Sequence, residues 1–408
     1  MKKIILIICD GMGDLPIREF GNKTPLEAAS TPNMDRLAKN GTTGIIYVLG
    51  KGIRPNSDDA HLTLFGYNVK KDYPERGAIE AAGVSIKLEQ GDIALRANLA
   101  TVDKELRVKD RRAGRIEDTT PFVKELDGMV IDNVRFIVKP GTGHRVIIVM
   151  RGKNLSDKIS NSDVHYASST KIVKEWMNKK VLAIKPMDKT EEAKFTANVL
   201  QKFLERSHKI LEKNPLNDER EKEGKLRGNH LLTRFAGYYK KLKPFEDRYG
   251  LKACCIAGAG LYKGLGAIAG MDLIQVKGAT GLPNTDVKAK IEAAKKAIKK
   301  YDFVFVHIKP ADIYGENGDY KGKKEFIEKI DKAIDDLDKV NATIVITADH
   351  STPCCCKDHS GDPAPLLIYK RDIKADNLAK FSEKECKKGS LGIVYGKDFM
   401  KTILKLAK

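Results

Sequence analysis

Four short runs of apolar residues along the chain predict buried β-strands. The runs are KIILIICDG at the N-terminus and KACCIAGAG, DFVFVHIKP and ATIVITADH beyond residue 250. Each is almost continuously hydrophobic, which is the pattern of parallel strands that are covered on both faces. Helical patterns separate three of these runs from one another. This part of the chain is therefore predicted to form an α/β fold around a mainly parallel sheet.

The middle of the chain has a different pattern of polar and apolar positions. The stretches DIALRANLATVDKELRVKD and VRFIVKPGTGHRVIIVMRG alternate and turn like antiparallel strands, and KTEEAKFTANVLQKFLERSHKILEKN follows as a long helical segment. We expect an inserted α+β domain over residues 83–237, within an α/β domain formed by residues 1–82 and 238–408. A length of 408 residues fits two domains better than one compact core.

The composition is that of a soluble, globular protein, with 41% hydrophobic and 32% charged residues. The apolar run Ile4–Cys9 is too short for a signal peptide, and Asp10 ends it. No apolar run approaches the roughly 20 residues that a membrane span requires. We therefore expect no membrane association.

The formal net charge of +19 raises the alternative of a non-enzymatic nucleic-acid-binding protein. Lysines are instead scattered among glutamates in segments such as KIEAAKKAIKKYD and KKEFIEKIDKAIDDLDKV, a pattern typical of solvated helix faces. We expect no nucleic-acid partner, and a basic background would also attract an anionic metabolite. Glutamine occurs only at positions 90, 201 and 275, and this scarcity beside a surplus of Lys and Glu indicates a thermophile.

The seven cysteines include the pair Cys254–Cys255 and the run Cys354–Cys356. Adjacent cysteines do not easily bridge each other, and no CxxC pair occurs. Reduced thiols that pack as small hydrophobes are the expected state of the chain in the cytoplasm. The run Cys354–Cys356 lies near candidate metal ligands, so a ligand role for it stays open.

The stretch RPNSDDAHLTLFGY allows two roles for Ser57. Serine is a good helix N-cap, and an apolar helix carrying His61, Leu62, Leu64 and Phe65 follows it. The positive end of that helix would equally suit a phosphate beside a nucleophilic serine. This stretch alone leaves both roles open.

Carboxylate and imidazole side chains follow three of the predicted strands. The first strand ends in Asp10, the DFVFVHIKP run leads to Asp312 and Glu316, and the ATIVITADH run ends in Asp349 and His350, with His359 shortly after. In an open parallel sheet, ligands bind beyond the carboxyl ends of the strands. Each residue alone would be an ordinary turn or loop residue, but together they predict a two-metal site of the kind used in phosphoryl transfer. Metal coordination would then activate Ser57 as a nucleophile.

An ordered set of motifs carries a family resemblance over nearly the whole chain. CDGMGD, PNSDDAHLTLFGY, RGAIEAAG, DRRAGRI, GATGLPNTD, ADHSTP and HSGDPAP occur in this order. The chain thereby resembles the archaeal-type cofactor-independent phosphoglycerate mutases of the alkaline phosphatase superfamily. The resemblance implies an alkaline-phosphatase-like core. It also implies interconversion of 2-phosphoglycerate and 3-phosphoglycerate, in glycolysis and gluconeogenesis, through a phosphoserine and without 2,3-bisphosphoglycerate.

The resemblance also implies the metal ligands. One ion would be held by Asp10, Ser57, Asp349 and His350. The other would be held by Asp312, by His359 and by the residue four positions after Asp312, where the family usually has histidine and this chain has Glu316. Glutamate is a hard ligand, so manganese or magnesium are the expected ions, with zinc or cobalt as alternatives.

Arginines suit a substrate that carries a phosphate and a carboxylate, because they bind both groups in a bidentate manner. The candidate substrate-binding residues are Arg111, Arg112, Arg115, Arg234 and Lys263. Of these, Arg111, Arg115 and Arg234 coincide with segments of the family. We expect the inserted domain to act as a lid that keeps glycerate bound and water out. If it admitted water, the same core would be a metal-dependent phosphomonoesterase or another phosphotransferase, which is the alternative function. The expected partner is the small-molecule substrate, and a homo-oligomer is left open.

Overall fold

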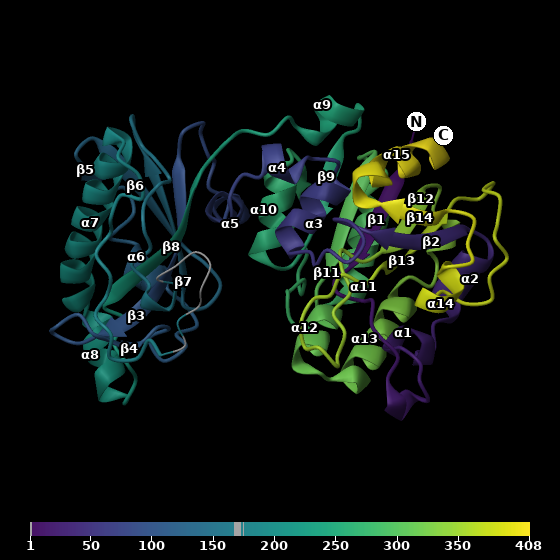
Figure 1. Cartoon of the computed structure of the whole chain (residues 1–408), viewed down its shortest axis with the longest axis horizontal. Coiled ribbons are helices and arrows are strands. Elements are labelled where there is room, and N and C mark those ends of the chain that lie inside the picture. The colour runs from purple at the N-terminus through teal and green to yellow at the C-terminus, as the bar shows by residue number, and fades with distance from the viewer. Residues whose placement is uncertain (1, 167–172, 174) are drawn as a thin grey trace. The chain divides into compact units, whose positions relative to one another are not determined.

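The chain divides into two compact units in the computed structural model, which describes residues 2–166, 173 and 175–408. Unit 1 comprises Met1–Tyr73 and Lys243–Lys408, and unit 2 comprises Pro74–Leu242. Figure 1 shows unit 1 around the strands labelled β1 and β11 and unit 2 around β3 and β7. The division falls at residues 73/74 and 242/243, nine and five residues outside the expected boundaries at 82/83 and 237/238.

Unit 1 is built on an eight-stranded sheet in the order β10-β9-β11-β1-β12-β13-β2-β14. The four predicted strands are its central members and run parallel to one another. All residues of β1, β11 and β12 are buried, which requires cover on both faces of the sheet. The α/β expectation with a mainly parallel sheet is confirmed. The strands are β1 (Ile4–Cys9), β2 (Thr42–Tyr47), β9 (Ala253–Ile256), β10 (Asp272–Leu273), β11 (Phe303–Ile308), β12 (Thr343–Thr347), β13 (Ala364–Tyr369) and β14 (Gly392–Tyr395).

The other half of this sheet was not predicted from the sequence. Strand β13 is antiparallel to both β12 and β2, and β14 forms the edge. Pro365 lies within β13, and proline argues against an interior strand because it lacks a backbone donor. Gly44 in β2 likewise argues against a strand, because glycine is unfavourable inside strands. It is required there because a Cβ atom would come within 2.6 Å of the Gly392 carbonyl oxygen in β14.

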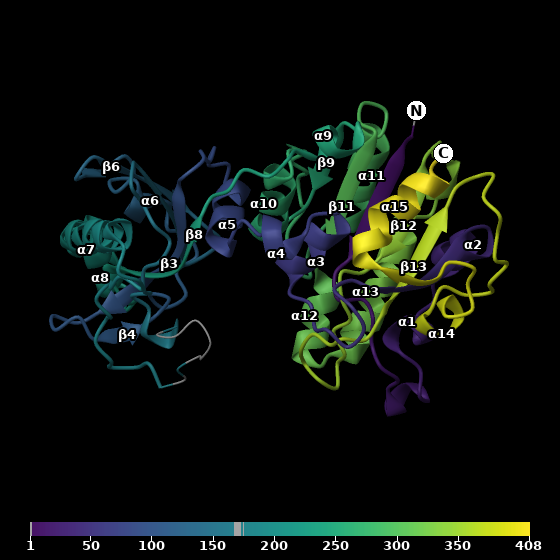
Figure 2. The same cartoon turned by 45° about the horizontal axis from the view of Figure 1, so that its top comes forward.

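Two sets of helices pack against this sheet (Figures 1 and 2). Helices α11 and α13 contact each other, and α13 contacts α1 and α2, while α10 and α15 both contact α3. The charged segments KIEAAKKAIKKYD and KKEFIEKIDKAIDDLDKV lie largely in α11 and α13, as their amphipathic pattern predicts. The helices are α1 (Pro25–Ala28), α2 (Pro32–Lys39), α3 (Ser57–Leu64), α4 (Val69–Asp72), α9 (Phe245–Tyr249), α10 (Gly260–Ile268), α11 (Val287–Ala297), α12 (Pro310–Asn317), α13 (Tyr320–Ala333), α14 (Glu383–Cys386) and α15 (Gly396–Leu406).

Unit 2 is an antiparallel sheet packed against a long helix, as the alternating pattern of this region predicts. The sheet runs β4-β3-β7-β6-β5, and β8 pairs with β3 along residues 93–100. Phe136 from β6 stacks on Phe203 from α7 with ring centroids 4.0 Å apart, at the centre of the core. The strands are β3 (Ile93–Val102), β4 (Val108–Asp110), β5 (Val130–Ile131), β6 (Val134–Pro140), β7 (Arg145–Arg151) and β8 (His230–Tyr238), and the helices are α5 (Arg76–Gly83), α6 (Thr120–Val123), α7 (Glu191–Glu212) and α8 (Pro215–Lys222).

Candidate metal centre

Three adjacent parallel strands of unit 1 end at one edge of the sheet, and their following residues form a buried acidic cluster. Asp10 follows β1, Asp349 and His350 follow β12, and Asp312 lies in α12 directly after β11. All four side chains are 2% exposed or less. The structure therefore brings together the candidate ligands that the sequence placed at separate strand ends. Two groups of possible metal ligands result, one of Asp10, Asp349 and His350, the other of Asp312, His350 and His359.

The first group presents three acceptor atoms to one another. His350 Nε2 lies 3.4 Å from Asp10 Oδ1 and 3.3 Å from Asp349 Oδ2. None of these three buried atoms has a hydrogen-bond partner among the residues that the structure describes. Buried polar atoms are almost always paired, so an arrangement of converging, unpaired acceptors fits a cation.

Thr352 determines which nitrogen of His350 faces this group. The Thr352 hydroxyl donates to Asp312 Oδ1 at 2.6 Å and lies 3.0 Å from His350 Nδ1. Because its single proton goes to Asp312, the hydroxyl accepts from His350 Nδ1–H. Burial lowers the pKa of His350 to about 3, so the ring is neutral and Nε2 keeps its lone pair. This is the tautomer that a metal ligand requires.

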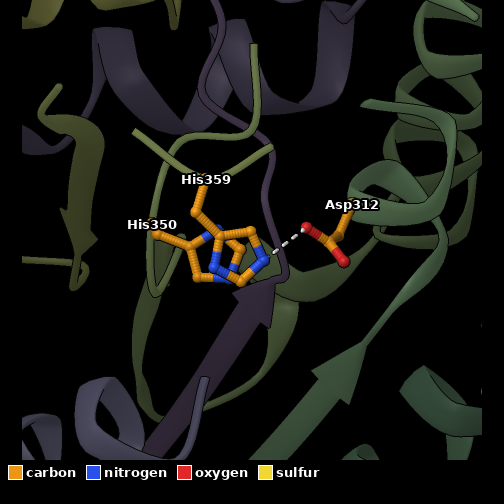
Figure 3. A group of neighbouring side chains, drawn as sticks. All are labelled: Asp312, His350 and His359. Carbon is orange, nitrogen blue, oxygen red and sulfur yellow. Dashed lines mark ion pairs between the residues drawn. The ribbon is translucent and has the colours of Figure 1, made fainter. Parts of the chain in front are cut away.

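The second group adds His359 to the cluster (Figure 3). Its Nε2 lies 3.4 Å from Asp312 Oδ1, and its ring stacks on that of His350 with centroids 3.7 Å apart. Its Nδ1 lies 2.9 Å from the carbonyl oxygen of Pro55 and therefore donates to it, so Nε2 is the acceptor when the ring is neutral. Burial lowers the pKa of His359, but Asp312 and the Pro55 carbonyl outweigh it and raise this pKa. Both histidines are thus oriented by hydrogen bonds on their far sides.

The carboxylates of the cluster have strongly shifted pKa values. Burial, together with the charge of Asp10, raises the pKa of Asp349 well above its usual value. Burial also raises the pKa of Asp10, but Lys309 and the hydrogen bond from His307 outweigh it and hold this pKa well below its usual value. Two carboxylates that share one buried position respond in this way, since both cannot stay ionised without a cation.

Three further residues satisfy the other oxygen of Asp10. Its Oδ2 accepts from the Tyr262 hydroxyl and from His307 Nε2 at 3.0 Å, and it lies 3.3 Å from Lys309 Nζ, which also contacts Asp312. Neither Tyr262 nor Lys309 was predicted from the sequence to be a site residue. Lys309 had a detectable signal, because it stands three positions before Asp312 and so lies on the same helical turn.

Ser57 is the first residue of α3 and not its cap. Asn56 holds the capping position, without a side-chain capping bond, so of the two roles left open for Ser57 the capping role is wrong. His61 lies one turn further along α3 and was not predicted to be a site residue. Its Nδ1 donates to the Ser57 carbonyl at 2.7 Å and lies 3.5 Å from Asp349 Oδ2. With Pro55 bonded to His359 on the other side, the backbone that carries Ser57 is attached to both ligand groups.

Close backbone approach at the centre of the cluster requires a glycine. Gly11 has φ +63°, and a Cβ atom there would lie 2.5 Å from Thr352 Oγ1 and 2.7 Å from Asp312 Cβ. Its backbone N–H donates to Asp349 Oδ1 at 3.3 Å. The glycine after Asp10 therefore lets three ligand-bearing segments meet.

Glu316 lies at the margin of the second group. Its Oε1 is 4.0 Å from His359 Nε2, and its side chain is 51% exposed. Burial of the remainder and the charge of Asp312 raise its pKa. Glu316 is not a member of either compact ligand group among the described residues.

The candidate substrate-binding arginines fall into two kinds. Arg111 and Arg234 are buried in unit 2, where the Asp163 carboxylate accepts from Arg111 Nε at 2.9 Å and from Arg234 Nη1 at 2.9 Å. Arg112 and Arg115 are exposed and form no ion pair with any described residue. Together with Arg111 they line a cavity of about 270 Å³, whose walls are Asp110, Arg111, Arg112, Arg115, His165 and Trp176. Lys263 lies elsewhere, in α10 of unit 1, 3.3 Å from Gln275 Oε1.

Within the described part of the chain, no helix combines the length and apolar character needed to cross a membrane. Residues 2–406 match the family described as Metalloenzyme superfamily. A 2,3-bisphosphoglycerate-independent phosphoglycerate mutase of Methanosphaera stadtmanae is 43% identical over 98% of this chain and 96% of its own length. Another enzyme of that name, from Archaeoglobus fulgidus, is 44% identical over 99% of this chain and 97% of its own.

Two solved structures agree with these relatives. A protein from Pyrococcus horikoshii has a TM-score of 0.81 at 34% identity, and the match covers all of this chain and 97% of the Pyrococcus chain. A cofactor-independent phosphoglycerate mutase from Thermoplasma acidophilum has a TM-score of 0.76 at 34% identity, with both chains fully covered. The chain belongs to the archaeal 2,3-bisphosphoglycerate-independent phosphoglycerate mutase family of the metalloenzyme superfamily.

Proposed function

We propose that this protein interconverts 2-phosphoglycerate and 3-phosphoglycerate without 2,3-bisphosphoglycerate, at a site that binds two divalent ions in unit 1. The observation that carries the proposal is the convergence of unpaired, buried acceptor atoms from Asp10, Asp349 and His350. Family membership gives the reaction, and the geometry supports the cation binding that the reaction needs.

The proposed ligand assignment comes from the family resemblance, and the two groups in the structure support it for Asp10, Asp349, His350, Asp312 and His359. Asp10, Ser57, Asp349 and His350 would hold one ion, and Asp312, His359 and Glu316 would hold the other. Oxygen ligands outnumber nitrogen ligands in both sets, which favours manganese or magnesium over zinc or cobalt. Bound ions would supply positive charge for the phosphate and lower the pKa of the serine hydroxyl.

Ser57 is proposed as the phosphoryl carrier. Its hydroxyl attacks the substrate phosphate, a P–O bond forms to Ser57 Oγ, and the bond to the glycerate oxygen breaks. The other glycerate hydroxyl then takes the phosphoryl group back from Ser57. Ser57 stands at the positive N-terminal end of α3, where Asn56 makes no side-chain capping bond, and this end of the helix would favour a phosphate.

Unit 2 is proposed to supply cations for the anionic substrate. Arg112 and Arg115 are exposed and unpaired among the described residues, so their guanidinium groups are available to a carboxylate or phosphate. Arg111 and Arg234 already share the Asp163 carboxylate, which leaves one net positive charge in that buried group. We propose that this unit retains glycerate between the two transfers and so keeps the reaction a mutase rather than a phosphatase.

The test is turnover of 3-phosphoglycerate in the presence and absence of manganese, with chelator-treated protein as the starting point. We expect activity to require the ion, and His350→Ala to lose manganese binding in a direct titration. Metal-independent turnover, or full manganese affinity in that variant, would refute the assignment. Release of free phosphate without isomerised product would instead favour a phosphomonoesterase.

A further inference from the structure

The 351–360 loop follows His350, contains His359 and carries two exposed, adjacent thiols. Cys355 and Cys356 are exposed, and their sulfur atoms lie 3.6 Å apart. The metal centre described above uses neither thiol. All other cysteines of the chain are buried, which makes this pair the one accessible dithiol of the protein.

A rigid base presents these two thiols. The backbone N–H groups of Cys356 and Lys357 both donate to the carbonyl of Pro353 at 3.0 Å, which forms a turn. Below the turn, the N–H of Cys354 donates to the Asp14 carboxylate, and this carboxylate is paired with the fully buried Lys323 at 2.7 Å. The loop is closed at its other end by Ser360 N–H, which donates to the Ser351 carbonyl at 3.0 Å.

The spacing of the sulfur atoms suits chelation better than a disulfide. Adjacent Cα atoms are about 3.8 Å apart, which is shorter than the ~4.4–6.8 Å that disulfides span. By contrast, two sulfurs bound at ~2.3 Å to one tetrahedral ion lie about 3.8 Å apart. The observed 3.6 Å is close to that separation.

We propose that Cys355 and Cys356 form a chelating site for a thiophilic centre, either a soft metal ion or trivalent arsenic, and that its occupation disturbs the metal centre through the 351–360 loop. The connection is short. Thr352 in this loop orients His350 and bonds Asp312, and His359 at the loop's end is itself a ligand candidate. This second part of the proposal rests on the metal site of the proposed function.

The chain contains its own control for the chelate. Cys254 and Cys255 are also adjacent, but both are buried in strand β9. Neighbouring residues of a strand point to opposite faces of the sheet, so their thiols do not converge. A reagent that needs two converging, accessible thiols should therefore distinguish the pair in the turn from the pair in the strand.

The probe is phenylarsine oxide, added to the folded, manganese-loaded protein. Two arsenic–sulfur bonds form, the arsenic–oxygen bond is lost, and the two thiol protons leave with that oxygen as water, while arsenic stays trivalent. We expect one phenylarsenic group per chain by intact mass, with two titratable thiols lost, and reversal by an excess of a 1,2-dithiol but not of a monothiol. Cys355→Ser and Cys356→Ser should each abolish the stable adduct. No adduct on the parent protein, or an adduct that persists in the double variant, would overturn the chelating site.

The coupling is tested by manganese titration of the same adduct. Changes to groups that orient metal ligands typically cost 10–100-fold in metal affinity. We expect the adduct to weaken manganese binding at least tenfold, while the same treatment of Cys355→Ser leaves the affinity unchanged. An adduct with unchanged manganese affinity overturns the coupling, and failure of the untreated protein to bind manganese would instead refute the metal site itself.

Discussion

Replacement of Ser57 separates a chemical role from a structural one. Ser57 opens α3 without acting as its cap, and no described residue forms a side-chain hydrogen bond with its hydroxyl. Alanine at the first helical position should therefore change the free energy of unfolding by less than ~0.5 kcal/mol. Loss of the nucleophile should lower turnover by on the order of ten-thousandfold or more, equivalent to about 5 kcal/mol of activation free energy.

Thr63 in the same helix provides the matched control. Its hydroxyl donates to the Asp59 carbonyl at 2.8 Å, and the residue is 9% exposed. Thr63→Ala should cost about 1 kcal/mol of stability through the lost hydrogen bond and leave turnover within a few-fold of the parent. Ser57→Ala is thus expected to lose turnover but not stability, and Thr63→Ala to lose stability but not turnover.

The assays are a coupled measurement of 2-phosphoglycerate formation at saturating manganese and urea unfolding of the same preparations. Incubation of the parent with substrate, followed by acid quench and peptide mapping, should place a phosphate on Ser57. Turnover of Ser57→Ala within tenfold of the parent would refute the covalent role. A loss of more than 1 kcal/mol in stability would show that the hydroxyl has a structural partner after all.

Three further predictions concern the metal ions, the substrate and the pH dependence of stability. Glu316→His should raise the affinity for zinc relative to manganese, because an imidazole replaces a hard oxygen ligand; unchanged affinities for both ions in parallel titrations would show that Glu316 is not a ligand. Arg115→Ala should lower mutase turnover roughly 10–100-fold and raise the share of free phosphate, because glycerate loses a charged contact while the phosphoserine is exposed to water. Quantifying both products of one reaction checks this, and a constant phosphate share would restrict Arg115 to substrate binding. Burial raises the pKa of Glu383 from 4.5 to about 7, so its contribution to stability is complete below pH 4.5 and is lost as the pH rises through 7. The difference in unfolding free energy between the parent and Glu383→Gln should therefore change by up to about 3 kcal/mol between pH 4.5 and 8, and a constant difference would contradict the raised pKa.

The central strands were predictable because a parallel strand that is covered on both faces has a simple, continuous apolar pattern. The positions of Asp10, Asp312 and Asp349 at one edge of the sheet were predictable too, because neighbouring parallel strands have their carboxyl ends at the same edge. Strands β2, β13 and β14 do not follow this rule. Pro365 and Gly44 occupy strand positions for reasons that only the neighbouring backbone explains.

The sequence also identified the arginines but not their partners. Asp163 lies far from Arg111 and Arg234 in the sequence, and it has the burial of a core residue. Only the pairing of β3 with β8 and the return of the chain near residue 163 bring the three charges together. Similarly, the N-terminal position of Ser57 in α3 follows from backbone geometry, which serine and asparagine satisfy equally well at a cap.

The charge balance of the metal centre connects its folding to its chemistry. Asp10, Asp312 and Asp349 place three carboxyl groups in a fully buried region, and Lys309 contacts only the first two of them. His350 adds an acceptor but no positive charge, because burial lowers its pKa to about 3. A buried carboxylate without a cation carries a large desolvation cost. In this cluster, burial and the charge of Asp10 raise the pKa of Asp349, which favours its neutral form. The fold thus holds a site that is more stable with divalent ions than without them, and the same excess of negative charge is what would bring a metal-bound phosphate to Ser57.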